Sequence, residues 1–497
     1  MQASGLPVVN KTTLATHLKQ LEQMSPENGV NENMHPNAKA DAVNAPTKTL
    51  TAISIDSDAG SPLNGHLQRA PEQRPPASAG SFATRLEILP CAHSQPRRHL
   101  YMKPADVAAA IDARIERMAR KWTDNNASLK YSQLAHPGQL NLDPVAVIGR
   151  IVCDTDAPLN ASSLLLESSR ALASGYRVPL DVSAVKMASR TFFLFPGQIV
   201  LLEGVNPDGK CFKASRIIQS TGGWLMQIPR LPESYADYSQ FDTGVLSFMS
   251  ASGPFSPSDC INFRALSQIL TMAIARQPEV LHLSGPFVDY QAEYLMEELP
   301  DRVFKQEVVQ RLREFAIQSP RTRLILSPSI RDAMSGCDPV FPQPTPNWDI
   351  SDLRATILPN PAVFFINEVC FAVGNNDILG AIAKDSIPVG HGRDAASGLC
   401  ASILHQGSLY PVAPSIASGC VDYTRWEQLE LLFAPDVLLL PSPSVPALAR
   451  TVPEDNCIVV NASHGQAALI TINAPLANGG DSVDRRASRI RVDFIQG

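Results

Sequence analysis

Residues 195–218 read FPGQIVLLEGVNPDGKCFKASRII, and this stretch indicates how the first folded part of the chain is built. Two runs rich in apolar residues flank the tetrapeptide Asn206-Pro207-Asp208-Gly209. Proline fixes φ at the second position of a type I turn, and glycine tolerates a positive φ. The stretch therefore predicts a β-hairpin.

The residues before this hairpin continue a pattern of short strands separated by turns. Residues 145–154 read VAVIGRIVCD, a β-rich run that Gly149 interrupts, as at a bend or bulge in a small barrel. The pattern extends from Pro144 to about Ser220. Its length and rhythm predict a five-stranded β-barrel of the OB type over residues 139–225.

After about Phe241, strands alternate with longer helical segments. Strands are predicted at GVLSFMSASG, EVLHLSG and TRLILSPS, with a helix from Ser258 to about Ala275 and a long amphipathic helix over residues 290–316. Further strands follow at VFFIN, PDVLLLP, CIVVN, ALITIN and RIRVDFI. An alternating first half with a strand-rich end predicts a layered α/β domain over residues 240–497.

The first hundred residues contain a single aromatic residue, Phe82, and are rich in Pro, Asn, Ala and Ser. Such a segment cannot bury enough apolar surface to offset the entropy of the chain. Residues 1–98 are therefore predicted to be mostly disordered, with a mobile tether over residues 26–98. A possible short helix at residues 12–24 is the exception, and it is either a docking helix or a transient helix without a partner. Its apolar stripe consists of Leu14, Leu18, Leu21 and Met24.

Residues 99–138 are predicted to form a helical lead-in to the barrel. Pro104 suits the first position of a helix, because proline lacks the N–H that would be unpaired there. One apolar stripe follows at helical spacing. It consists of Val107, Ile111, Ile115, Met118 and Trp122.

Composition excludes several classes of protein. The 497 residues carry a formal net charge of −6, whereas proteins that grip duplex DNA usually show a basic excess. Contact with DNA is therefore expected to be local or mediated by a partner. The nine cysteines include no CxxC pair, which argues against a zinc finger and indicates reduced thiols in a cytosolic or nuclear compartment. Neither a signal peptide nor an apolar run long enough to span a membrane is recognisable.

A set of segments over residues 100–497 resembles the family of DNA polymerase alpha B subunits in order and spacing. The related B subunits of other replicative polymerases are the nearest alternative. The segments are GRIVCD (149–154), VPLDVS (178–183), LFPGQIVLLEGVNPDGK (194–210), SGPF (252–255 and 284–287), LSPSIRDA (326–333), VFPQP (340–344), INEV (366–369), LYPVAP (409–414) and PDVLLLPS (435–442).

The resemblance implies an OB domain packed against a calcineurin-like phosphoesterase domain. It also implies that the two domains together bind the C-terminal, zinc-containing domain of the polymerase's catalytic subunit. The primase subunits would be reached through the complex, contact with DNA would be mainly indirect, and no membrane would be involved. A member of this family is expected in the nucleus as a scaffold and regulator that performs no nucleotide chemistry.

The loops that would carry metal ligands support a loss of chemistry. A two-metal phosphoesterase needs Asp, His and Asn side chains at strand ends to clamp its cations. Here no Asp or His occurs over residues 244–257, and none occurs over residues 441–444. The other two loops retain only degenerate positions, so no metal, no cofactor and no catalytic residue are expected. These positions are Gly285, Pro286 and Asp289 in one loop and Ser327, Pro328 and Ser329 in the other.

Three features imitate parts of a metal site. Residues 374–377 read Gly-Asn-Asn-Asp, but they lack the histidine and are interpreted as a turn before a helix. Residues 390–392 read Gly-His-Gly in what is expected to be a surface loop. His282 lies in a strand and is expected to be a hydrogen-bonded core residue. Asp289 is predicted to cap the helix at 290–316, since Asp is a preferred N-cap.

Two other functions stay open on the sequence alone. A divergent metallophosphoesterase is one, and the missing ligands argue against it. The other is an OB protein that binds single strands, which needs exposed aromatic side chains beside a basic groove. The aromatic candidates are Phe192, Phe193, Phe195 and Phe212, and the basic residues near them are Arg190, Lys210 and Lys213.

Two sets of residues are candidates for contact and regulation. In VFPQPTPNWDI (340–350), Phe341 and Trp348 are candidate anchors for a partner, or they complete the core of the chain itself. Ser25 and Ser61 each precede a proline. They are candidate sites for proline-directed kinases, or parts of ordinary turns.

Overall fold

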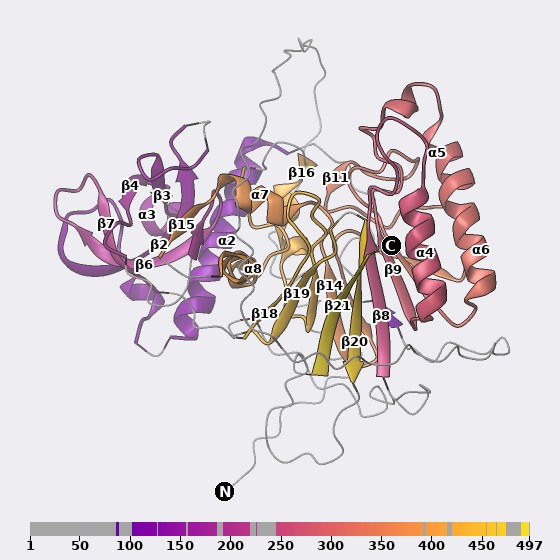
Figure 1. Ribbon diagram of the computed structural model, residues 1–497. Helices are drawn as coiled ribbons and strands as arrows, with labels where there is room; N and C mark the ends of the chain where they lie inside the picture. The colour runs from indigo at the N-terminus through magenta and orange to yellow at the C-terminus, as the bar shows by residue number, and fades with distance from the viewer. Residues whose placement is uncertain are drawn as a thin grey trace, which may run out of the picture. The chain divides into compact units, whose positions relative to one another are not determined.

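The computed structural model describes most of the chain beyond residue 101 (Figure 1). The described ranges are 86–88, 102–126, 128–155, 158–185, 192–218, 225, 245–390, 394–414, 420–453, 455–463, 465–473 and 489–496. The predictions for Ser25, Ser61 and the helix at 12–24 lie outside these ranges. Of the helices in them, none is both long enough and apolar enough to cross a membrane.

Helix α2 (Pro104–Asp124) begins at the proline, and a 3₁₀ turn, η1 (Tyr131–Gln133), follows it. The backbone N–H of Asn125 bonds to the carbonyl of Lys121 and ends the helix. The C-terminal half of the apolar stripe is buried, at Ile115, Met118 and Trp122. The helix therefore packs against the rest of the chain through its second half.

The predicted OB-type barrel is confirmed as a closed sheet in the order β2-β3-β4-β7-β6. A short helix, α3 (Arg170–Ala173), connects β3 to β4. The hairpin predicted from Asn206 and Gly209 joins β6 to β7, and Gly209 has a φ of +71°. The strands are β2 (Asn141–Cys153), β3 (Leu164–Glu167), β4 (Arg177–Asp181), β6 (Ile199–Asn206) and β7 (Phe212–Ile217).

A two-stranded sheet beside the barrel includes a strand from a distant part of the chain. Strand β5 (Phe192–Leu194) pairs antiparallel with β15 (Ile387–Val389), which lies about two hundred residues later in the sequence. The Val389 side chain is buried in the same cluster as the barrel's own core. The barrel core is therefore completed by the α/β domain.

We expect Val389→Ala to lower the free energy of unfolding by about 1–3 kcal/mol, because the smaller side chain leaves a cavity in the barrel core. The matched control is Ile317→Ala, at an aliphatic side chain that is 80% exposed in helix α6 (Gln310–Gln318) of the α/β domain. Urea denaturation of both variants measures the difference. Equal stabilities would show that β15 contributes nothing to the barrel.

The α/β domain consists of two six-stranded sheets that pack face to face. The first sheet has the order β12-β10-β9-β8-β20-β21, and β8, β9, β10 and β12 are parallel. Its strands are β8 (Val245–Ser252), β9 (Val280–Ser284), β10 (Arg323–Ser327), β12 (Ala355–Ile357), β20 (Gln466–Asn473) and β21 (Ile490–Gln496).

The second sheet has the order β1-β13-β14-β17-β19-β18. The ring of Phe248 in the first sheet stacks on that of Phe371 in the second, with 4.6 Å between the ring centres. The strands are β1 (Leu86–Ile88), β13 (Ala362–Ile366), β14 (Val369–Val373), β17 (Val437–Leu439), β18 (Leu448–Val452) and β19 (Cys457–Asn461).

Helices cover the outer faces of both sheets (Figure 1). On the first sheet lie α4 (Arg264–Arg276) and one continuous helical run made of α5 (Pro300–Val303), a π-helical segment η4 (Phe304–Val309) and α6 (Gln310–Gln318). On the second sheet lie α7 (Ile378–Asp385) and α8 (Ala395–Gln406). The connections contain η3 (Glu293–Met296), η5 (Tyr423–Leu429) and the short paired strands β11 (Val340–Phe341) and β16 (Cys420–Val421).

Three predicted boundaries were wrong. The helix expected from Ser258 begins at Arg264. The Ser256 hydroxyl donates to the carbonyl of Cys260 and accepts from the backbone N–H of Asn262, and these two bonds hold residues 256–262 in a turn. The helix expected over 290–316 begins at Pro300, a residue that suits a first turn. Residues 86–88, inside the predicted tether, form strand β1 on the edge of the second sheet.

Candidate functional site

The loops after β8, β9 and β10 meet at one edge of the first sheet, because these three strands are parallel. The backbone N–H of Gly253 bonds to the carbonyl of Ser284, and that of Gly285 bonds to the carbonyl of Ser327, both at 2.8 Å. A Cβ atom at Gly253 would lie 2.1 Å from the carbonyl oxygen of Pro286. The loops are therefore in direct backbone contact.

All six degenerate positions lie in or beside this group of loops. Gly285 and Pro286 are buried, and so are Ser327, Pro328 and Ser329. Asp289 is partly exposed at the rim and forms an ion pair with Arg331. The prediction that Asp289 caps a helix was wrong, because the chain continues as a turn held by its contact with the N–H of Gln291.

Asp332 lies at the centre of the loops and was not singled out from the sequence. Its buried carboxylate accepts hydrogen bonds from the backbone N–H groups of Phe287 at 2.5 Å, Ser329 at 2.8 Å and Val288 at 3.3 Å. Burial raises the pKa of Asp332 to about 7, although these three donors lower it in part. The carboxyl group thus ties the β9 loop to the β10 loop.

Three buried amide side chains, together with Asp332, fill the space between the loops after β9 and β10. Asn375 donates to the carbonyl oxygens of Gly285 at 2.9 Å and Pro328 at 3.2 Å. Asn360 donates to the carbonyl of Asn375 and accepts from its N–H, each at 2.9 Å. Gln343 donates to the carbonyl of Ser329 at 3.1 Å. We call Asp332, Gln343, Asn360 and Asn375 the buried polar plug.

The turn predicted at residues 374–377 is confirmed, since it connects β14 to α7 and Asp377 caps that helix. It is closer to the loops than its position in the sequence suggested. Strand β14 belongs to the second sheet, yet it delivers Asn375 to the loops of the first. Residues 390–392 include His391, which lies outside the described residues.

His282 is a core residue, as predicted. It is fully buried, and its ring nitrogens lie 3.0 Å from the Ser250 hydroxyl and 2.9 Å from the Ser327 hydroxyl. Burial lowers its pKa to about 3, so the ring is neutral at physiological pH. In the part of the chain that the structure describes, no group of three or more His, Cys, Asp or Glu side chains is arranged to hold a metal ion.

The candidate partner anchors are in the interior. Phe341 is fully buried, and its ring centre lies 6.0 Å from that of Tyr410. Trp348 is 7% exposed and packs edge-on against Phe287 and at a tilt against Phe304. Both therefore complete the core of the chain, the second of the two interpretations, and neither is accessible as an anchor.

The aromatic residues considered for single-strand binding are also mostly interior. Phe192, Phe195 and Phe212 are buried, and only Phe193 is partly exposed. Lys210 and Lys213 are exposed on the barrel, but stacking of bases needs an aromatic platform beside them. Arg190 lies outside the described residues. Among these four candidates, the barrel therefore offers no fully exposed aromatic side chain for this function.

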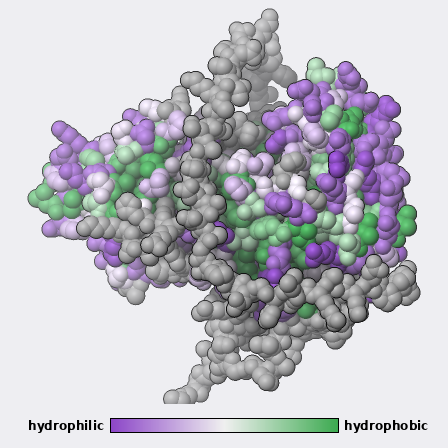
Figure 2. Space-filling model, viewed as in Figure 1, coloured by the Kyte–Doolittle hydropathy of each residue, from purple (hydrophilic) through white to green (hydrophobic). Residues whose placement is uncertain are grey.

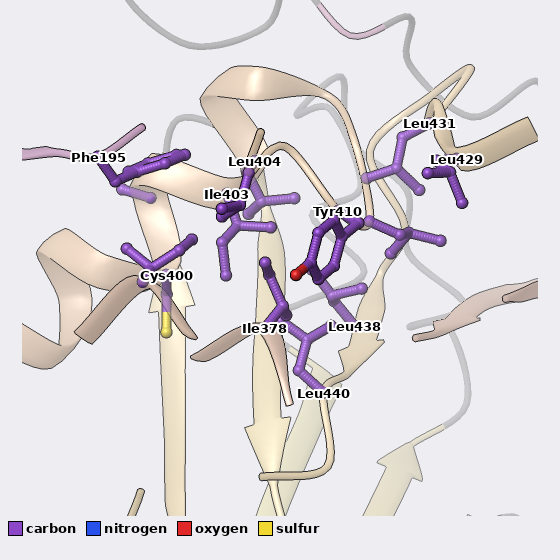
Figure 3. Close-up of a cluster of buried hydrophobic side chains, with 14 of the residues drawn as sticks. Phe195, Ile378, Cys400, Ile403, Leu404, Tyr410, Leu429, Leu431, Leu438 and Leu440 are labelled. Atoms are coloured by element: carbon purple, nitrogen blue, oxygen red, sulfur yellow. The ribbon is translucent and has the colours of Figure 1, made fainter. Parts of the chain in front are cut away.

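Helix α8 joins the barrel to the α/β domain. The side-chain amide of Gln406 accepts from the N–H of Ile199 at 2.9 Å and donates to its carbonyl at 2.8 Å, in the way a neighbouring strand would. Figure 3 shows Phe195, from the barrel, beside Cys400 of α8 in one apolar cluster. The same cluster includes Ile403, Leu404, Leu438 and Leu440.

Helix α2 reinforces this junction through charge. The buried Arg114 donates to the carbonyl of Gln406 at 3.1 Å and stacks over the ring of Trp426. Arg117 forms an ion pair with Glu430 at 2.8 Å. Burial opposes ionisation of Glu430, but Arg117 and Arg114 outweigh it and lower its pKa. The barrel, α2 and α8 therefore form one connected unit.

The fold and the site together define a protein made of an OB barrel joined to a two-sheet α/β domain whose central loops are filled by polar side chains of its own. A family model for the B subunit of DNA polymerase alpha/epsilon matches residues 248–449, and a model for the OB domain of the DNA polymerase alpha B subunit matches residues 108–220. The chain belongs to the family of DNA polymerase alpha/epsilon B subunits.

Curated relatives agree with this assignment. The DNA polymerase alpha B subunit of Schizosaccharomyces pombe (strain 972 / ATCC 24843) is 31% identical over 380 residues, which cover 69% of this chain and 62% of that protein. The Bos taurus protein of the same name is 29% identical over 374 residues, covering 72% and 59%. That of Saccharomyces cerevisiae is 25% identical over 434 residues, covering 74% and 59%. The chain thus spans about three fifths of the length of these relatives.

Proposed function

We propose that this chain is a non-catalytic accessory subunit of DNA polymerase alpha–primase, acting in the nucleus as a scaffold and regulator in the initiation of DNA replication. The observation that carries the proposal is the buried polar plug in a member of the B-subunit family. We infer that these side chains occupy the place where an active phosphoesterase would hold cations and substrate. A site of this kind supports a structural role.

The α/β domain is proposed to be an inactive member of the calcineurin-like phosphoesterase class. Its support is the pair of six-stranded sheets and the parallel strands β8, β9 and β10, whose loops meet at one edge. Active enzymes of this class place metal ligands in such loops. The loops here present mainly glycine, proline and serine, and their two carboxylates, Asp289 and Asp332, bind other groups of the chain.

The proposed partner is the C-terminal domain of the catalytic subunit of DNA polymerase alpha. A stable subunit interface buries on the order of 2,000 Å² or more, and the joined barrel and α/β domain offer a preformed surface of sufficient size. The primase subunits are then reached through the complex. With a net charge of −6, contact with DNA is proposed to be mainly indirect.

We expect the purified chain to contain no stoichiometric Mn²⁺, Mg²⁺ or Zn²⁺ and to hydrolyse no generic phosphodiester. The reason is that the two carboxylates in these loops are already engaged, Asp332 with backbone N–H groups and Asp289 with Arg331, whereas a cation needs several carboxylates or imidazoles converging on one point. Elemental analysis and a bis(p-nitrophenyl) phosphate assay, run beside an active metallophosphoesterase, measure both. Bound metal together with hydrolysis would overturn the proposal.

Co-purification tests the partner directly. The full chain is expressed with the C-terminal domain of the catalytic subunit of DNA polymerase alpha and, in parallel, with the corresponding domain of polymerase epsilon. We expect a stable complex with the domain from polymerase alpha and none with the domain from polymerase epsilon. Binding to the epsilon domain instead would favour an accessory role in another replicative polymerase, and binding to neither would sink the proposed function.

A further inference from the structure

Four large apolar side chains are exposed on the segments that follow β8 and β9, which a backbone hydrogen bond from Glu293 to Ser258 joins beside the central loops. They are Ile261, Tyr290, Met296 and Leu299, with exposed fractions of 39%, 50%, 89% and 72%. We call these four residues the apolar ledge. Tyr290 directly follows Asp289 at the rim of the loops, while Met296 ends η3 and Leu299 precedes α5.

The backbone under the apolar ledge is held in place. The N–H of Glu293 bonds to the carbonyl of Ser258 at 2.7 Å, which joins the segment after β9 to the segment after β8. The N–H of Tyr290 bonds to the carbonyl of Arg331 at 2.9 Å. Ala292 is buried beneath, and Leu295 packs on the core that lies under α4 and α6. The exposed side chains therefore stand on an ordered support.

Acidic residues flank the apolar ledge. Asp259, Glu293 and Glu297 are exposed, and Glu298 forms a long ion pair with Arg302 at 3.6 Å. The nearby Arg331 is already paired with Asp289. Figure 2 shows hydrophobic and hydrophilic residues side by side over the corner where Figure 1 labels α5. Over residues 258–264 and 289–302, six Asp and Glu side chains outnumber the two basic ones, Arg264 and Arg302, so these segments are apolar at the surface and carry a net negative charge.

The apolar side chains and the negative charge together indicate which kind of ligand the surface would bind. An exposed group of large apolar side chains is typical of an interaction surface rather than of ordinary solvent-facing protein. Carboxylates repel phosphates, so a nucleic acid backbone is disfavoured. A helix with apolar residues at i, i+3, i+4 and i+7 and lysines or arginines beside them would match the ledge and its rim.

We propose that the apolar ledge is a docking surface for a basic amphipathic helix of a partner protein. This goes beyond the proposed function, because it assigns a second binding surface that does not depend on which polymerase the chain serves. The loops beneath it no longer admit a substrate, and the rim beside them holds a peptide instead.

The test uses the full chain and a fluorescein-labelled synthetic peptide of about four helical turns, with leucines on one face and lysines on the other. Fluorescence anisotropy measures its affinity for the wild type and for the double variant Met296→Ser, Leu299→Ser. We expect the double variant to bind at least about tenfold more weakly, since both central apolar contacts are lost. Glu293→Lys should weaken binding as well, and the effect should shrink at high salt.

Ile317→Ser is the matched control, because Ile317 is 80% exposed on α6, away from the ledge. Its affinity should equal that of the wild type. Thermal melts of every variant separate loss of binding from loss of fold. The proposal is overturned if the wild type does not bind the peptide, if the double variant binds as tightly as the wild type, or if a peptide with glutamates in place of the lysines binds equally well.

Discussion

Replacing Arg114 with alanine is expected to lower the free energy of unfolding by about 3–5 kcal/mol, because it removes a buried charge that joins three parts of the chain. The guanidinium donates to the carbonyl of Gln406 at 3.1 Å, lies 4.7 Å from the ring centre of Trp426 and sits 3.8 Å from the carboxylate of Glu430. Alanine makes none of these contacts and leaves a cavity between α2 and the second sheet's helices.

The effect should extend beyond overall stability. Gln406 also pairs with Ile199 of the barrel, so a shift of the end of α8 weakens the link between the barrel and the α/β domain. Urea denaturation is followed by tryptophan fluorescence and by far-UV circular dichroism. In the wild type the two transitions should coincide, and in Arg114→Ala they should separate, because two units then unfold independently.

Arg491→Ala is the matched control. Arg491 is also an arginine in an ion pair, but its side chain is 69% exposed on β21, the edge strand of the first sheet. Exposed pairs contribute about 0–1 kcal/mol. If Arg114→Ala is no more destabilising than Arg491→Ala, the junction does not depend on the buried guanidinium.

Local patterns explain why the barrel was predictable and its completion was not. The hairpin around Asn206 and Gly209 depends on a turn whose chemistry lies within four residues. The pairing of β5 with β15 and the amide contact of Gln406 with Ile199 join segments about two hundred residues apart. Nothing in the sequence of Ile387–Val389 distinguishes a strand of the α/β domain from one that serves the barrel.

The candidate site, like the fold, has features that the sequence predicts and features that only the structure shows. The sequence shows that residues 244–257 and 441–444 contain no Asp or His, because this requires only that particular residue types be missing after particular strands. The side chains that fill the space beside these loops cannot be identified from the sequence. Asp332, Asn360 and Asn375 are ordinary polar residues in separate segments, and only the fold brings them together. For the same reason, the sequence left open whether Phe341 and Trp348 contact a partner or complete the core, and the structure places both in the interior.

Replacing Asp332 with alanine is expected to destabilise the chain by about 3–5 kcal/mol. The carboxylate pairs the buried N–H groups of Phe287, Val288 and Ser329, and its removal leaves all three without that acceptor. Each buried donor that loses its partner costs about 1–3 kcal/mol, with partial relief from rearrangement. Asp332→Asn keeps the shape and one acceptor oxygen, so we expect an intermediate loss.

The pH dependence of stability, compared between the wild type and Asp332→Asn, tests the role of the buried carboxyl group independently. Burial raises the pKa of Asp332 to about 7 in the folded chain, above the value of about 3.9 in an unfolded one. The part of the stability that comes from protonation of Asp332 is therefore fully present below about pH 4 and is lost as the pH rises through 7, while the hydrogen bonds to the carboxyl oxygens remain. The advantage of the wild type over Asp332→Asn should shrink between these values and stay constant above about pH 8.

Urea denaturation across this pH range measures both effects, with Asp352→Ala as the control. Asp352 is paired with Arg313 on the surface, where its side chain is 51% exposed, and its replacement should change stability by less than about 1 kcal/mol. A loss for Asp332→Ala no larger than for Asp352→Ala would mean that the loops hold together without the carboxylate. The buried polar plug would then be a consequence of the loop structure, and the central argument for a retained structural role would lose its physical basis.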